Sequence, residues 1–136
     1  MIRSRFGPAA RPFVEGIIRL PRLGASLIVP LLIDTGADTT SLSPRDWRAA
    51  GLRESDFSGP SVTITGYGGE VICPVERAEL ILQHENGARD RWAVDIEIAP
   101  ATRASGLIPS ILGRDILREY RLVCSPSEGV LTMDAP

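Results

Sequence analysis

The sequence LLIDTGADTT, residues 31–40, carries the strongest structural signal in the chain. Its first three residues are apolar and form a run that is typical of a buried strand. The run ends at Asp34, whose carboxylate is costly to remove from water unless a partner compensates it. Gly36 permits backbone angles or close approaches that a side chain would forbid. We therefore predict a tight loop at the rim of a core, with Asp34 partly shielded from water.

Two interpretations of Asp34 are open from this stretch alone. In the simpler one, the strand is followed by an Asx-type turn, and the carboxylate accepts a hydrogen bond from its own backbone. In the other, the carboxylate does chemistry. The residues on either side of Asp-Thr-Gly, and two further blocks of sequence, favour the second interpretation.

Three blocks in order resemble the retropepsin-like, or retroviral-type, aspartic proteases. Residues 32–37 (LIDTGA) are similar to the active-site motif of that family, and the following Asp-Thr continues the retroviral version. Residues 111–117 (ILGRDIL) resemble the family's apolar-apolar-Gly-Arg-Asp/Asn segment, and residues 66–69 (GYGG) a glycine-rich flap tip. The resemblance covers roughly residues 11–134. It implies an all-β acid protease lobe with two short helices and a flap hairpin, working as a homodimer.

The bulk properties describe one globular domain. The chain has 136 residues, which is enough to bury a core without disulfides, and an apolar content of 43%. Net charge is −2 with no basic patch, so we expect no nucleic-acid partner. No apolar stretch is long enough for a signal peptide or a bilayer span, and we expect a soluble, cytoplasmic protein without a membrane partner. Cys73 and Cys124 lack metal spacing, and we expect buried free thiols.

The local pattern predicts mostly strands. We expect a flexible N-terminal arm over residues 1–12 and the protease-like domain over residues 13–136. Strand composition is found at 13–20 and 26–33, and Pro30 suggests an edge or a bulge in the second of these. Predicted hairpins join 61–65 with 71–73, 75–83 with 90–98, and 121–124 with 130–133. Short helices are predicted after Ser43, as its N-cap, and over 113–120.

Hydrolysis of a peptide by carboxylates needs two of them, one acting as base and the other as acid. The chain has one Asp-Thr-Gly, and no other aspartate is followed by Thr-Gly or Ser-Gly. If the resemblance holds, the second catalytic carboxylate is Asp34 of a second subunit, and a twofold axis passes between the copies. The expected partners are thus a second copy of the chain and a peptide or protein substrate.

The resemblance also implies roles for the neighbouring residues. Thr35 would hydrogen-bond across the twofold axis. The simpler alternative is that its hydroxyl only stabilises the turn. Gly36 and Ala37 would lie against substrate backbone. Asp38 would contact substrate and form a buried ion pair with Arg114, which is otherwise a solvated helix residue.

The glycine-rich segment is expected to bind substrate too. Gly66, Tyr67, Gly68 and Gly69 would fold over the bound peptide as a flap, or else form an ordinary hairpin turn. Asp115 receives no catalytic role.

Other chemistries have little support. His84 is the only histidine, beside a turn, so no metal site or other cofactor is expected. The chain has no Gly-x-Ser-x-Gly elbow and no phosphate-binding loop. The sequence thus predicts a homodimeric aspartic endopeptidase. The alternatives are a non-catalytic dimerisation or peptide-binding module of the same fold, and a processing protease restricted to one partner or to itself.

Overall fold

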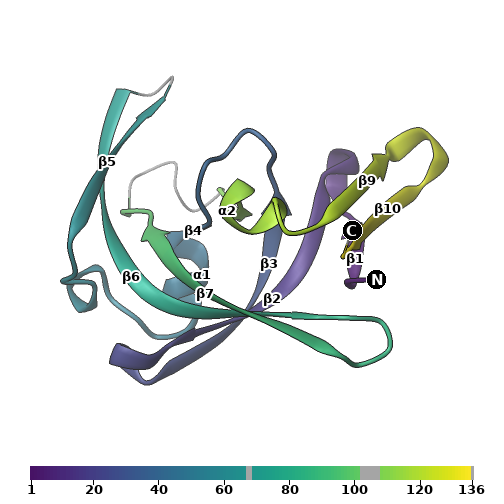
Figure 1. Cartoon of the computed structure of the whole chain (residues 1–136). Coiled ribbons are helices and arrows are strands. Elements are labelled where there is room, and N and C mark those ends of the chain that lie inside the picture. Colours follow the sequence, from purple (N-terminus) through teal and green to yellow (C-terminus); the bar gives the residue numbers. More distant parts are fainter. Residues whose placement is uncertain (67–68, 102–107, 136) are drawn as a thin grey trace.

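The computed structural model describes residues 1–66, 69–101 and 108–135, most of which lie in strands (Figure 1). The strands are β1 (Ser4–Phe6), β2 (Pro12–Leu20), β3 (Ala25–Ile33), β4 (Ser41–Leu42), β5 (Ser61–Gly66), β6 (Gly69–Gln83), β7 (Arg89–Ile98), β8 (Ser110–Leu112), β9 (Arg121–Ser125) and β10 (Val130–Asp134). The α-helices are α1 (Pro44–Ala49) and α2 (Arg114–Leu117), and the 3₁₀ turns are η1 (Pro8–Ala10), η2 (Pro21–Leu23), η3 (Glu54–Asp56) and η5 (Pro126–Glu128). The all-β class with two short helices is thereby confirmed.

The main sheet closes on itself. Its strand order is β1-β2-β3-β8-β4-β7-β6-β5, and an additional pairing between β2 and β6 joins its two sides. The ring thus consists, in order, of β2, β3, β8, β4, β7 and β6. Each of these strands has a neighbour on both sides over part of its length, so few backbone groups are left at an edge. β9 and β10 form a separate antiparallel pair on the opposite side of the molecule from the β5–β6 hairpin (Figure 1).

The core follows from a period of two along the strands. In β2 and β3, alternate apolar side chains are buried, while Glu15 and Ser26 face water. β3 pairs with β2 over residues 25–32 without a bulge and with β8 only from Leu31 onward. Pro30 has no N–H to donate, and it lies where β3 is paired with β2 but not yet with β8. This position agrees with the prediction that Pro30 marks an edge of the strand.

β6 belongs to two hairpins at once. Its first six residues pair with β5, and Val75 to Gln83 pair with β7. The sequence predicts two separate strands here, but the structure runs one strand through Pro74. The Val75 N–H donates to the Pro60 carbonyl at 2.7 Å, which fixes the point where the β5–β6 hairpin leaves the body of the sheet.

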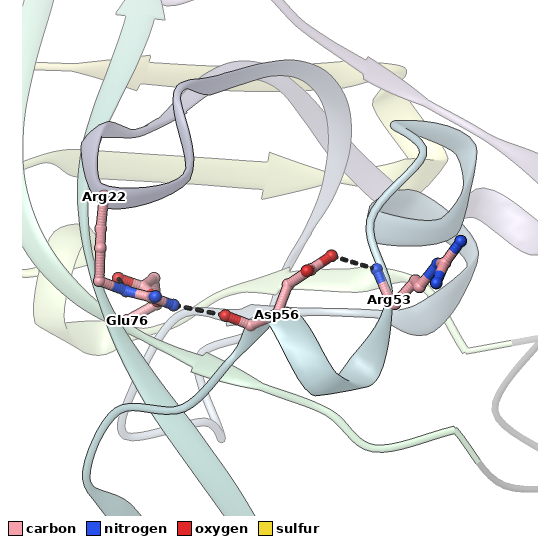
Figure 2. A network of polar contacts seen from close by, with 4 residues as sticks. All are labelled: Arg22, Arg53, Asp56 and Glu76. Carbon is pink, nitrogen blue, oxygen red and sulfur yellow. Dashed lines mark hydrogen bonds and ion pairs between the residues drawn. The ribbon is translucent and has the colours of Figure 1, made fainter.

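A polar network holds the root of that hairpin (Figure 2). The Glu76 side chain is 5% exposed, and its carboxylate accepts a hydrogen bond from Arg22 Nε at 3.0 Å. Arg22 Nη2 also donates to the Asp56 carbonyl at 2.6 Å, and Asp56 Oδ2 accepts from the Arg53 N–H at 2.7 Å. The β2–β3 turn, β6 and the segment before β5 are therefore tied together.

A second network lies at the other end of the β6–β7 hairpin. Tyr120 donates to Asp90 Oδ2 at 2.7 Å and accepts from Trp92 Nε1 at 2.9 Å, while His84 Nε2 lies 3.0 Å from the same Asp90 oxygen. Burial raises the pKa of the Tyr120 hydroxyl far above its usual value, and the bond to Asp90 raises it further. Tyr120 therefore stays a donor, and it ties the segment after α2 to this hairpin.

The structure differs from the sequence expectation in three other places. The segment expected to be a flexible arm is packed: Ile2 is 1% exposed, its N–H donates to the Met133 carbonyl, and β1 pairs with β2. The helix predicted over 113–120 is shorter, and it buries Ile116 and Leu117. Cys73 is buried, but Cys124, on β9, is exposed.

Candidate active site

Asp34 lies where two parallel strands end. β3 pairs in parallel with β8, and Ile33 is opposite Leu112. The Asp34 N–H donates to the Leu112 carbonyl at 3.1 Å, so the backbone of this residue still belongs to the ladder. The carboxylate therefore follows directly on two buried strands, at the partly exposed rim that the sequence predicted.

A tight turn follows Asp34. The Ala37 N–H donates to the Asp34 carbonyl at 3.2 Å, and the Gly36 N–H donates to Asp34 Oδ1 at 2.9 Å. The second bond is the Asx-type contact of the simpler interpretation. A Cβ on Gly36 would lie 3.2 Å from Asp34 Oδ1, so this residue allows the turn to close onto the carboxylate. Thr35 is exposed beside it.

The ILGRDIL block holds this loop through backbone hydrogen bonds. The Arg114 N–H donates to the Ala37 carbonyl at 2.9 Å, and the Asp115 N–H donates to the Asp38 carbonyl at 3.2 Å. The first N–H groups of a helix have no partner within the helix. Here the loop supplies those partners, so the start of α2 and the shape of the loop determine each other.

Arg114 also reaches the loop with its side chain. Its Nη1 donates to the Thr35 carbonyl at 2.8 Å, and its Nη2 forms an ion pair with Asp38 Oδ1. The Arg114 side chain is 51% exposed and that of Asp38 84%. The pair forms, but the expectation that it is buried is wrong for the single chain, because both side chains are exposed.

Asp115 does more than the sequence suggested. Its carboxylate accepts hydrogen bonds from the Thr40 N–H at 3.0 Å, from Thr40 Oγ1 at 2.8 Å and from the Ile116 N–H at 2.9 Å. Thr40 is fully buried, and its hydroxyl also accepts from the Gly113 N–H at 3.2 Å. A Cβ on Gly113 would lie 2.5 Å from the Thr39 carbonyl, so glycine is required for this close approach. The available signal in the sequence was an acidic residue directly before the apolar pair Ile116 and Leu117.

A cleft of about 620 Å³ borders the loop. Residues 36–39 and Ser41 line it from the Asp-Thr-Gly side, and residues 63–65 line it from β5. The sheet contributes Cys73, Glu97, Ala99 and Ile111. Predicted substrate-binding residues Gly36, Ala37 and Asp38 are thus brought together in one wall of a cleft.

The glycine-rich segment lies at the far end of the β5–β6 hairpin. Gly66 and Gly69 are cross-strand partners, and Gly69 has a φ of 93°, which favours glycine. Tyr67 and Gly68, which complete the predicted flap tip, lie outside the described residues. The hairpin itself projects from the sheet (Figure 1).

Within the described ranges, no three or more histidine, cysteine or acidic side chains gather in a way that could hold a metal ion. None of the described helices is long and apolar enough to cross a membrane.

The comparisons with solved structures agree with this topology. One similar structure is a retropepsin-like aspartic protease from Rickettsia conorii, with a TM-score of 0.57 and 12% sequence identity. The match covers 98% of this chain and 88% of the Rickettsia chain. The chain has the retropepsin-like fold. Another similar structure is EIAV protease complexed with the inhibitor HBY-793, at 21% identity and a TM-score of 0.48, covering 83% of this chain and 90% of the viral one. No family model and no curated protein matches the sequence.

The retropepsin-like fold accounts for the spacing of the sequence blocks. Residues 32–37 and 111–117 are far apart along the chain, yet the fold pairs β3 with β8 and places α2 under the loop. At such low identity the likeness concerns the fold alone. Function has to be argued from the site.

Proposed function

We propose that this chain is a homodimeric aspartic endopeptidase. The two Asp34 carboxylates, one from each subunit, together activate a single water molecule. The observation that carries the proposal is the position of Asp34: at the end of a buried parallel strand pair, on a loop held by α2 and bordering a cleft. Proteases are also the proteins similar in fold, as their names state.

The need for a second subunit follows from the number of carboxylates. General acid and base roles at one peptide bond need two carboxyl groups that share a proton. Asp38, on the same loop as Asp34, lines the cleft, and Arg114 engages it in an ion pair. Asp34 of a second copy, related by a twofold axis, would supply the missing group.

The neighbouring residues would then hold the substrate and the dimer. Exposed Thr35 is free to hydrogen-bond across the axis, and its carbonyl is held by Arg114. Gly36 and Ala37 would let a peptide backbone lie close to the loop. The β5–β6 hairpin, with Gly66 to Gly69 at its end, would cover the peptide as a flap.

The test is incubation of the protein and its Asp34→Asn variant with a mixed peptide library, followed by mass spectrometry. Asparagine keeps an Oδ1 that can accept the Gly36 N–H, so the variant should keep the folded loop. We expect the wild type to cut peptides and the variant to be slower by at least about 100-fold, the contribution of one acid or base.

Two outcomes would contradict the proposal. Undiminished cleavage by Asp34→Asn would exclude the carboxylate mechanism. Peptides that bind the wild type without being cut would point to the peptide-binding module instead.

A further inference from the structure

Glu97 lies in a row of side chains that crosses the floor of the cleft. Ser41 of β4 is the cross-strand partner of Ile111 on β8 and of Glu97 on β7. Directly paired residues point to the same face of a sheet, and so does Ala99, two residues after Glu97. All four residues line the cleft. Strand pairing with β4 on one side and β6 on the other therefore fixes Glu97 in the floor of the cleft.

Glu97 is partly buried, and its carboxylate has no hydrogen-bond or ion-pair partner among the described residues. This distinguishes it from the other described acidic side chains that are not exposed. Each of those has a polar partner: Asp34, Asp46, Asp56, Glu76, Glu79, Asp90, Asp115 and Asp134. Because a partly desolvated carboxylate is costly without a partner, Glu97 is suited to receive one from outside the chain.

The surroundings define the chemistry of that partner. The described lining of the cleft has no basic side chain, and its other acid, Asp38, already has Arg114. Burial raises the pKa of the neighbouring Cys73 thiol, and the negative charge of Glu97 raises it further. Cys73 therefore stays a neutral thiol and adds no negative charge of its own beside Glu97. The apolar wall beside Glu97 comes from Ala99 and Ile111, with Ile64 from β5.

We propose that Glu97 selects substrates that carry an arginine or lysine side chain in this cleft. This inference rests on the proposed peptidase function. The methylene stem of the basic residue would pack on Ile111 and Ile64, and its charged head would pair with the Glu97 carboxylate. Arginine should be preferred to lysine, because its planar fork can bind a carboxylate through two parallel bonds.

The test uses a cleaved peptide from the library and substitutes each flanking position in turn with arginine, lysine or glutamine. The readout is the ratio of kcat/KM for the arginine peptide to that for the glutamine peptide, which removes any effect shared by both. In the wild type, one position should favour arginine by about tenfold or more, as for a hydrogen bond to a charged group. In Glu97→Gln that ratio should fall to within about twofold of one.

Glu85→Gln is the matched control. Glu85 is an exposed acid at the β6–β7 turn, outside the described lining of the cleft, and its substitution changes the net charge equally. This variant should keep the wild-type ratio. The inference is overturned if Glu97→Gln keeps the ratio, if Glu85→Gln loses it equally, or if no position of the wild type favours a basic residue.

A binding experiment separates this inference from the proposed function. Fluorescein-labelled alanine peptides with one arginine or one glutamine are titrated into Asp34→Asn and into Asp34→Asn/Glu97→Gln, and anisotropy is measured. Tighter binding of the arginine peptide by the first variant only would support Glu97, even if the wild type cuts nothing and the peptidase proposal fails. Equal binding of both peptides by Asp34→Asn would overturn the role of Glu97 while cleavage by the wild type still stands.

Discussion

The Arg114 side chain connects α2 to the loop that follows Asp34. It holds the Thr35 carbonyl and the Asp38 carboxylate, but about half of it is exposed. An exposed ion pair contributes only ~0–1 kcal/mol to the free energy of unfolding. We therefore predict that Arg114→Ala melts within a few degrees of the wild type, while kcat/KM falls about 10- to 100-fold because the loop is misplaced.

Calorimetry and peptide kinetics on the same preparations check this prediction. Arg77→Ala is the control, since Arg77 pairs with Asp95 on the outer face of the sheet, where both side chains are 65% exposed. A variant of Arg114 that unfolds readily yet keeps its kinetics would show that the residue acts through stability instead.

Asp115 should have the opposite profile. It satisfies the buried Thr40 N–H and hydroxyl as well as a helix N–H. Removing one partner of a buried polar group costs ~1–3 kcal/mol. Asp115→Ala should lower the free energy of unfolding by at least that much in a urea titration, against Asp95→Ala as an exposed control. A loss no larger than that of the control would mean that water replaces the carboxylate at Thr40.

The chemistry-bearing residues were predictable to different degrees. Asp34 and Arg114 stand in blocks that resemble retropepsin-like motifs, so the resemblance singled them out. Asp115 stands in the same block as Arg114, but its role was not predicted, and Glu97 stands in no motif. What a carboxylate does depends on which distant backbone or cleft reaches it. The exposure of Cys124 was missed for a similar reason: apolar neighbours along the chain do not determine whether a second layer covers them.

At the scale of the elements, long strands with a period of two were predicted and short ones were not. The hairpins of β5–β6, β6–β7 and β9–β10 were all confirmed. β4 and β8 have two and three residues, and their pairing brings together segments far apart in sequence. No local pattern encodes such contacts. The same applies to β1 and Ile2, which were expected in a flexible arm but find partners on β2 and β10.

The network around Asp90 predicts how one hairpin responds to acid. Burial alone would raise the pKa of Asp90, but hydrogen bonds from Tyr120 and His84 lower it below its usual value. A carboxylate whose folded pKa is depressed stabilises the protein above its unfolded pKa of about 3.9, and this contribution is lost as the pH falls through the folded value.

Asp90→Asn should therefore lose less stability than the wild type on acidification. The measurement is the free energy of unfolding in urea at about pH 6 and about pH 3, on either side of the unfolded pKa. Asp95→Asn, which alters an exposed carboxylate on the same strand, is the control. Equal losses in Asp90→Asn and the wild type would show that the Tyr120 and His84 bonds do not stabilise the charged form.

At the scale of the whole molecule, one chain holds half of the proposed machinery. Its cleft is bordered by an Asp-Thr-Gly loop, and the sequence has no second Asp-Thr-Gly or Asp-Ser-Gly. The number of chains in the active unit was argued from this stoichiometry, because a sequence motif can count carboxylates. Which surface forms the interface could not be argued the same way, since it depends on the exposed faces of the finished fold.

A subunit-mixing experiment tests the shared active site most directly. Wild-type and Asp34→Asn chains are mixed in equal amounts, allowed to exchange, and assayed on a peptide cut by the wild type, with exchange verified by mass-tagged subunits. If pairing is random, about a quarter of the dimers keep both aspartates, because a twofold dimer takes one from each chain. Activity should then be about a quarter of that of the same total amount of wild type. A mixture that keeps about half of that activity would mean that each chain carries a complete site of its own, which contradicts the shared dyad.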